Sequence, residues 1–242
     1  MFPIKTTAVA LAAGAALTGC GPAASGTTEA TSTPSTPSRA AGAPAAEIAR
    51  VRGDRVGVYA EPGAAHRQKT LTSPNAYGAP RVLLVTQRSG GWLRVLLPTR
   101  PNGAQGWVRA SEVTLTSTTD RVVIRLGALR FAVYDGGRVV RSGRIAVGTG
   151  DNPTPPGRYY LTELLRSPDP HGDYGPYAYG LSGHSPTLKR FGTGPGQLAV
   201  HGTNRPALLG HRVSHGCIRV RNSDITWMAR SLALGTPVTV QR

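Results

Sequence analysis

The chain of 242 residues has little cysteine, few acidic residues and few aromatic ones. Its two cysteines cannot form the framework of a disulfide-stapled fold, and their surroundings differ so much that we expect no disulfide between them. Charged residues make up only 17% and aromatic residues 6%, whereas there are 31 Gly and 20 Pro, a balance that favours short strands and turns over long helices. Hydrophobic residues at 39% still suffice for a packed core, in one large domain or two small ones.

Acidic residues are much scarcer than basic ones: the chain has 12 Asp and Glu and 28 Lys and Arg, which gives a net charge of +16 at pH 7. A basic chain can bind nucleic acid, an anionic membrane or another anionic polymer. The arginines are scattered and no zinc-finger or helix-turn-helix spacing is present, so we expect no nucleic-acid partner. Attraction to anionic polymers of a cell wall fits better, although an arginine-rich genome would produce the same charge.

No apolar run is long enough to span a membrane, which takes about 20 residues. Residues 8–17 form an uncharged run behind the basic start, with the length of a signal-peptide core. The run ends in Leu17-Thr18-Gly19-Cys20, which resembles the lipobox of bacterial lipoproteins. The resemblance implies that residues 1–19 are a removed signal peptide and that Cys20 is acylated; an ordinary secretory signal followed by a chance cysteine is the alternative.

Residues 20–46 are predicted to be a disordered tether behind Cys20. From 21 to 46, every residue except Glu29 and Arg39 is Ala, Gly, Pro, Ser or Thr, and such a stretch cannot bury apolar surface. A tether has a use only if one end is held, so we expect a lipid-anchored protein of the cell envelope, on the extracytoplasmic face of the membrane. Folded structure should begin at Glu47.

Residues 47–117 alternate short apolar stretches with turn residues, which predicts a small β domain. The Gly-Trp pairs Gly91-Trp92 and Gly106-Trp107 are similar to those of bacterial SH3-like barrels found beside cell-wall enzymes. We expect both tryptophans in its core, with a ligand groove as the alternative. The candidate strands are residues 56–59, 82–86, 92–97, 106–109 and 113–116.

Residues 118–242 predict a second, mostly β domain with one helix near the C-terminus. The helix should be capped by Asn222 or Ser223, because Ile225, Met228 and Leu232 follow helical spacing after them. The long stretch 165–197 is rich in Gly, Pro and Tyr and is interpreted as an irregular lid or groove wall; a packed surface loop is the alternative. The candidate strands are residues 121–126, 129–134, 138–142, 144–148, 158–164, 198–200 and 237–240.

Cys217 is the remaining cysteine of the predicted folded part and has no partner there, which marks a candidate reactive thiol. A thiol needs a neighbouring base or positive charge to become a nucleophile. If residues 214–219 are extended, His215 and Cys217 point to one face, and a neighbouring strand would place His201 across from Cys217. The backbone N–H groups of Gly216 and Cys217 would then be oxyanion donors.

These residues resemble the signature of the L,D-transpeptidase family with its YkuD-type catalytic domain, in which a His is followed, after a loop, by Ser/Thr-His-Gly-Cys, an apolar residue and Asn or Arg. The resemblance covers about half of the chain and implies a β-sandwich with the cysteine in a cleft under a lid. The matching stretches are His201-Gly202-Thr203, Ser214-His215-Gly216-Cys217-Ile218-Arg219 and the turn Thr154-Pro155-Pro156-Gly157.

The resemblance also implies a reaction on the stem peptides of peptidoglycan. Cys217 would attack the carbonyl of the diamino acid, expel the terminal D-Ala, and pass the thioester to the side-chain amine of a second stem, giving a 3→3 cross-link. His201 would be the general acid and base, oriented by Gly202, while Ser214 and His215 shape the site and help to hold the acyl oxygen. The mechanism implies no metal or cofactor, and carbapenems should acylate Cys217.

Substrate contacts are expected from Tyr177, His184 and Arg219, with Tyr174 and Tyr179 also in the candidate lid. A carboxypeptidase or a protein-to-wall ligase could use the same nucleophile. A zinc peptidase using His201, His211, His215 and Cys217 is a further alternative, although no HExxH or similar spacing and no nearby carboxylate supports it. A non-catalytic wall-binding lipoprotein would leave the cysteine–histidine pair unexplained.

Overall fold

The computed structural model describes residues 46–242. The predicted signal peptide, the lipobox cysteine Cys20 and the tether lie outside the described residues, apart from the last tether position. No helix among residues 46–242 is long and apolar enough to cross a membrane. The described chain forms two large sheets, each with its own hydrophobic core, and two short two-stranded ones; we call the two parts the N-terminal region (46–118) and the C-terminal region (119–242).

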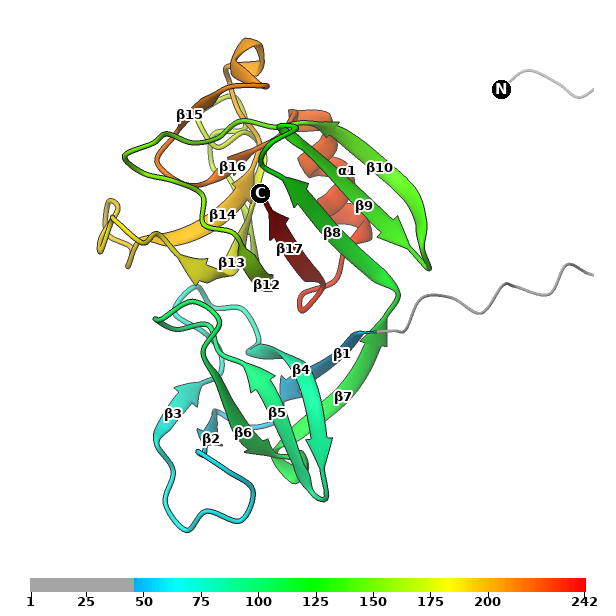
Figure 1. The fold of residues 1–242 in the computed structure, drawn as a ribbon, viewed down its shortest axis with the longest axis vertical. Helices are drawn as coiled ribbons and strands as arrows, with labels where there is room; N and C mark the ends of the chain where they lie inside the picture. The colour runs from blue at the N-terminus through cyan, green and yellow to red at the C-terminus, as the bar shows by residue number, and fades with distance from the viewer. Residues whose placement is uncertain (1–45) are drawn as a thin grey trace, which may run out of the picture. The chain divides into compact units, whose positions relative to one another are not determined.

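The N-terminal region is a five-stranded antiparallel sheet in the order β6-β5-β4-β1-β7, with the hairpin β2-β3 beside it (Figure 1). All five predicted strands are present, and two more, β1 and β3, were not predicted from the sequence. The small β domain is therefore observed, while its relation to SH3-like barrels stays a prediction. The elements are β1 (Ala46–Val51), β2 (Arg55–Val58), β3 (Lys69–Thr72), β4 (Val82–Ser89), β5 (Trp92–Leu96), β6 (Gln105–Arg109), a 3-10 turn (Ala110–Glu112) and β7 (Val113–Thr118).

Neither tryptophan of this region is in its core, contrary to the prediction. Leu93 and Val108 are buried, and because side chains alternate along a strand, Trp92 and Trp107 lie half-buried on the outer face. There the Trp92 ring meets the Tyr59 ring edge-on at 5.0 Å between centroids. The guanidinium of Arg109 lies 5.4 Å from both ring centres, close enough for a cation–π contact.

The C-terminal region is built on one eight-stranded sheet, in the order β10-β9-β8-β17-β12-β13-β14-β16, which curls around its core (Figure 1). This confirms a mostly β fold with one α-helix. A short parallel pair, β11-β15, lies beside the end of the sheet. The elements are β8 (Asp120–Arg125), β9 (Arg130–Asp135), β10 (Arg138–Arg144), β11 (Val147–Gly148), β12 (Gly157–Arg166), β13 (Tyr177–His184), β14 (Gln197–His201), a 3-10 turn (Pro206–Leu208), β15 (Arg212–Ser214), β16 (Ile218–Arg219), α1 (Asn222–Ser231) and β17 (Pro237–Gln241).

The stretch 165–197 is not one irregular segment, as predicted from its composition, because it contains the strand β13. The strand was not predicted because it contains two glycines, and glycine is unusual inside strands. Both make room for neighbours: a Cβ on Gly180 would overlap the carboxylate of Glu163, and one on Gly183 would overlap the ring of Tyr159. The irregular parts are therefore two shorter loops, residues 167–176 and 185–196.

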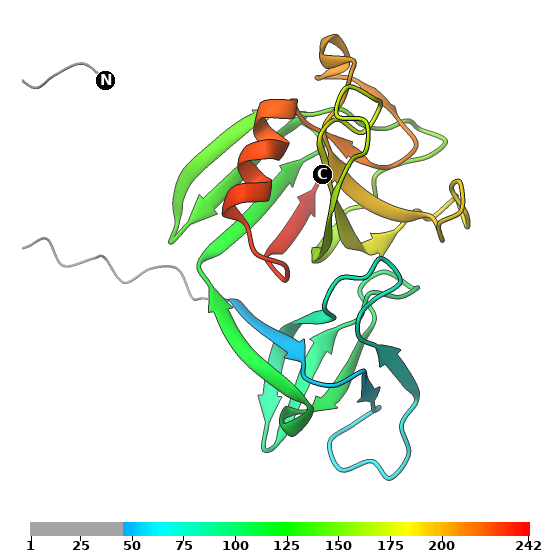
Figure 2. The same cartoon turned by 180° about the vertical axis from the view of Figure 1, so that it is seen from behind.

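The helix α1 lies over the core of the sheet, as the view from behind shows (Figure 2). Ile225 and Met228 are buried against that core. The predicted capping is wrong: Arg221 occupies the N-cap position without a side-chain cap, and Asn222 Oδ1 instead accepts a hydrogen bond from the Thr203 backbone N–H at 2.7 Å. The helix start is therefore tied to the segment that follows His201.

Candidate active site

His201 and the Cys217 segment lie on neighbouring strands, as predicted. Strand β14 runs parallel to β16, with Val200 opposite Ile218 and His201 opposite Arg219 (Figure 1). Cys217 comes just before β16, so it is displaced by two residues from the position across from His201. Both side chains nevertheless line one cavity of about 280 Å³.

The segment around Cys217 is a turn, so the extended conformation considered from the sequence does not occur. Strand β15 ends at Ser214 and β16 begins at Ile218, while Gly216 has a φ of +115°, a conformation that favours glycine. Ser214 holds this turn together, because its Oγ accepts the Gly216 N–H at 3.1 Å and donates to the Cys217 carbonyl at 2.6 Å. The Gly216 N–H is thus already engaged, and the prediction that it is a free oxyanion donor is wrong for this conformation.

Thr154 braces the same turn from the opposite side and was not predicted as a site residue. Its Oγ1 donates to the Gly216 carbonyl at 2.7 Å and accepts the Gly148 N–H at 2.9 Å. Thr154 is 4% exposed, so these bonds are shielded from water. The turn Thr154-Pro155-Pro156-Gly157 was noticed in the sequence, but its contact with Gly216 spans 62 residues.

His201 is set up as a neutral imidazole with one free ring nitrogen. Its Nδ1 lies 2.7 Å from the Gly202 carbonyl, which can only accept, so the proton is assigned to Nδ1 and Nε2 keeps its lone pair. The ring is 4% exposed and lies 4.6 Å from the Tyr174 ring. Burial lowers the pKa of His201 to about 4, assisted by the charge of Arg219 and opposed by the Gly202 hydrogen bond and by Asp173.

Cys217 is a free thiol. Burial raises the pKa of the Cys217 thiol above 9.0, while a backbone hydrogen bond at Ala199 and the charge of Arg219 act in the opposite direction. At neutral pH, the two groups therefore rest as a thiol and an uncharged imidazole. Such a pair can work by general-base catalysis, in which the proton leaves the thiol as it attacks.

A second hollow of about 600 Å³ adjoins the first, and Cys217 lines both. The lining of the first hollow includes the polar side chains of His201, His215 and Arg219 together with Cys217. Tyr174 and Phe191 line both hollows, and Phe191 also lies 5.4 Å from the His215 ring. A substrate can thus approach Cys217 along either hollow.

The three predicted substrate-binding residues are not brought together. Arg219 lines the first hollow, and its Nε, although buried, has no hydrogen-bond partner among the described residues. Tyr177 and His184 line neither hollow.

Alternation along β13 explains the positions of its tyrosines. Ala178 and Gly180 line the second hollow, so Tyr177 and Tyr179 point to the other face. Tyr179 is fully buried there, and its hydroxyl donates to the Leu232 carbonyl at 2.7 Å, so its predicted place in the lid is wrong. Tyr174, in the loop before β13, does lie at the site.

The N-terminal region holds one wall of the site, which the sequence did not indicate. Arg100 donates to the carbonyls of Ser185, Leu188 and Pro195 at 2.6, 2.9 and 3.0 Å. Asn102 exchanges two hydrogen bonds of 2.8 Å with the backbone of His184. Ser185, Leu188 and Phe191 of the loop 185–196 line the first hollow, so Arg100 and Asn102 act as positioning residues for that loop.

The variant Arg100→Ala should loosen this wall. Three hydrogen bonds to backbone carbonyls disappear, which should cost about 1–3 kcal/mol of local stability and slow acylation by a β-lactam about tenfold, because the wall no longer orients the ligand. Hydrogen exchange of residues 185–196 and the acylation rate measure both effects. The exposed Arg94→Ala is the matched control, and unchanged exchange in Arg100→Ala would contradict the positioning role.

Metal-ligating side chains do not gather at this site. Within residues 46–242, no group of three or more His, Cys, Asp or Glu side chains is arranged to hold a metal ion. His211, a member of the zinc set considered from the sequence, lines neither hollow.

Comparison with known proteins places the C-terminal region in a family. Residues 119–240 match the L,D-transpeptidase catalytic domain, YkuD. The protein of Bacillus subtilis (strain 168) named as an L,D-transpeptidase, YkuD, is 30% identical over 153 residues, covering 61% of this chain and 85% of that protein. Escherichia coli (strain K12) YbiS, also named as an L,D-transpeptidase, is 50% identical over 40 residues, covering 16% of this chain and 13% of that protein.

A solved structure of L,D-transpeptidase 3 from Mycobacterium tuberculosis, with a faropenem-derived adduct, is similar at 18% identity and a TM-score of 0.46, covering 81% of this chain and 98% of that one. The family match itself extends from before β8 into β17 and thus includes both His201 and Cys217. The chain belongs to the family of enzymes with the YkuD L,D-transpeptidase catalytic domain.

Proposed function

We propose that this protein is a cysteine-dependent peptidoglycan L,D-transpeptidase. The observation that carries the proposal is the meeting of His201, with a free Nε2, and the free thiol of Cys217 at one cavity. Family membership supplies the substrate class, the stem peptides of peptidoglycan. A thiol and a neutral imidazole can carry out acyl transfer without a metal ion.

In the first half-reaction, Cys217 Sγ attacks the carbonyl carbon of the diamino acid while His201 Nε2 takes the thiol proton. The carbon–nitrogen bond to the terminal D-Ala then breaks, and His201 returns the proton to the leaving amine. A thioester on Cys217 remains. The Arg219 guanidinium, with its buried Nε unpaired among the described residues, is suited to the carboxylate of the departing D-Ala.

In the second half-reaction, a side-chain amine of another stem attacks the thioester. The new carbon–nitrogen bond forms, the carbon–sulfur bond breaks, and the amine proton passes through His201 to the thiolate. The product is a 3→3 cross-link. Water as the acceptor would make the protein an L,D-carboxypeptidase, and a protein amine would make it a protein-to-wall ligase.

The test is incubation of the purified protein with a tetrapeptide stem, followed by mass spectrometry. A cross-linked dimer together with released D-Ala is expected, at a rate that a chelator does not change. A tripeptide alone would indicate carboxypeptidase activity, and loss of activity with chelator would favour the zinc peptidase. If the folded protein, with its thiol free, releases no D-Ala, the proposal is overturned.

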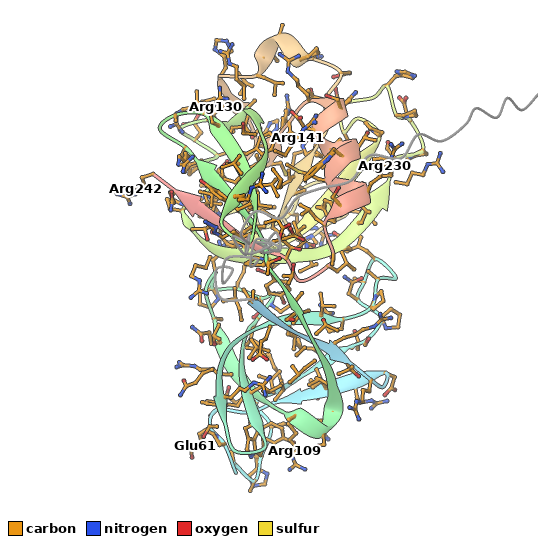
Figure 3. The ribbon with its side chains drawn as sticks, turned by 90° about the vertical axis from the view of Figure 1, so that its right-hand side faces the viewer. Glu61, Arg109, Arg130, Arg141, Arg230 and Arg242 are labelled. Carbon is orange, nitrogen blue, oxygen red and sulfur yellow. The ribbon has the colours of Figure 1, made fainter. Side chains whose placement is uncertain are left out.

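We also propose that the protein is held at the cell envelope through an acylated Cys20, with its positive surface facing anionic wall polymers. Exposed arginines occur on both regions; Figure 3 labels Arg109, Arg130 and Arg230 at the periphery. Cell fractionation tests the anchor, because Cys20→Ala should move the protein from the membrane fraction to the soluble one. Unchanged membrane association would contradict it.

A further inference from the structure

The second hollow has apolar walls and one buried carboxyl group in its lining. Tyr77, Leu165, Phe191 and Leu198 provide apolar surface around it. Its acidic side chain is Glu163, which is 2% exposed. An apolar channel that ends at a carboxylate fits an aliphatic chain with a cationic end.

The register of the sheet connects this carboxylate to the thiol. Glu163 is opposite Gly180 on β13, and Gly180 is opposite Ala199 on β14. Ala199 comes just before Val200, which pairs with Ile218, so Cys217 continues the row. All four residues line the hollow, and the two between the ends have little or no side chain. The row therefore connects Cys217 to Glu163 along one hollow, with the Gln197 amide beside Gly180 next to the carboxylate.

The length of this path is set by strand spacing. Neighbouring strands lie about 4.8 Å apart. The Glu163 carboxylate reaches over Gly180, because a Cβ on that glycine would overlap its Oε1. The carboxylate is thus about two strand spacings, or about 10 Å, from Cys217. A group bound there belongs to the far end of the acyl chain and not to the bond that is broken.

Glu163 is held in place by hydrogen bonds from neutral amide groups. Its Oε2 accepts from Asn75 Nδ2 and its Oε1 from Gln197 Nε2, both at 2.8 Å. No ion pair of Glu163 is found within residues 46–242. Arg81 is near enough for its charge to act on Glu163, but its Nε donates to the Thr72 carbonyl, and Arg166 lies exposed in the lining. Burial raises the pKa of the Glu163 carboxyl, against the effect of its hydrogen bonds and of the Arg81 charge, so a cation bound beside it would favour the charged form and complete the site.

We propose that the second hollow binds a primary ammonium group at the end of an aliphatic side chain, with the Glu163 carboxylate as its counter-ion. The inference rests on the proposed function and deepens it: the acyl group on Cys217 would be that of a diamino acid, read by Glu163 at its side-chain amine. Asn75 and Tyr77 come from the N-terminal region, which therefore helps to form the specificity site. Glu163 is a specificity-determining residue and takes no part in bond breaking.

The experiment compares tetrapeptide donors that differ only at the acyl residue: lysine, Nε-acetyl-lysine and norleucine. D-Ala release gives kcat/KM for each. For the wild-type protein, the lysine donor should be better than both neutral donors by about 10- to 100-fold, the worth of a desolvated ion pair. Glu163→Gln keeps the shape of the side chain. In this variant, the kcat/KM values of the three donors should agree within about twofold, chiefly because the value for the lysine donor falls. Equal use of the three donors by the wild-type protein would overturn the proposal even if the variant did not fold.

Acylation by faropenem, which has no ammonium group, tests the proposed function independently of the role of Glu163. It should proceed in wild type and at the same rate in the exposed control Glu61→Gln, whose position at the edge of the N-terminal region is labelled in Figure 3. If wild type forms no faropenem adduct and releases no D-Ala, the proposed function fails. If the adduct forms but Glu163→Gln keeps the wild-type preference for lysine, only the Glu163 assignment fails.

Discussion

Replacing Cys217 with alanine is expected to abolish the covalent β-lactam adduct and to lower D-Ala release by about a thousandfold or more, because the attacking sulfur is gone. Intact mass measures the adduct, and a peptide assay measures the release. Cys217 is half-buried in a turn whose hydrogen bonds come from Ser214 and Thr154 and from backbone atoms, so alanine should leave the turn and the fold intact.

The controls concern the fold and the nucleophile separately. Cys217→Ser keeps a heteroatom of similar position and should also fail to react, because a hydroxyl is far less nucleophilic than a thiol beside the same base. Thermal unfolding of both variants should match the wild type. An adduct that persists in Cys217→Ala would place the nucleophile elsewhere and refute the mechanism.

Replacing His201 with glutamine is expected to slow both half-reactions by about 10²- to 10⁴-fold, the usual value of general acid–base catalysis. Glutamine can still donate to the Gly202 carbonyl but cannot carry the proton from the thiol. The acylation rate with a β-lactam gives the first half-reaction alone. A rate within about threefold of the wild type would exclude His201 as the base.

The pH dependence of the wild-type protein tests the same assignment. The pKa of His201 is lowered to about 4, so the base form persists as the pH falls through 6.5, the ordinary value for histidine, and is lost only near 4. The pKa of the Cys217 thiol is raised above 9.0, so the thiol stays protonated through neutral pH. Acylation should therefore be flat from about pH 5.5 to 8. A decline centred near 6.5 would show that His201 is not held as a neutral base.

The chemistry of this protein was readable in the sequence because it depends on residue types at short spacing. A lone Cys217 in Ser-His-Gly-Cys, with His201 one loop earlier, predicts a thiol and a base on neighbouring strands, and strands β14 and β16 are adjacent. The mostly β fold with one helix followed from alternating apolar residues and frequent turns in the same way. Both features depend on residues close together in the sequence, so they can be predicted without knowledge of distant contacts.

Local backbone geometry around the thiol was decided by contacts that no pattern records. From the sequence, residues 214–219 could be considered as an extended segment, whereas the positive φ of Gly216 and the bonds of Ser214 and Thr154 make them a turn. The glycines of β13 suggested a loop, yet they are there because Tyr159 and Glu163 occupy the space of a side chain. A residue chosen for its neighbour's volume cannot be recognised until that neighbour is known.

The contribution of the N-terminal region was decided by tertiary structure alone. Arg100 reaches carbonyls 85 to 95 residues away, and Asn75 reaches Glu163 across 88 residues. In the sequence, Arg100 is one arginine among many and Glu163 is an acidic residue inside an apolar strand. The nucleophile and its base were therefore determined by local sequence, whereas the walls of the site, and the charge that we propose selects its substrate, arise only where distant segments meet.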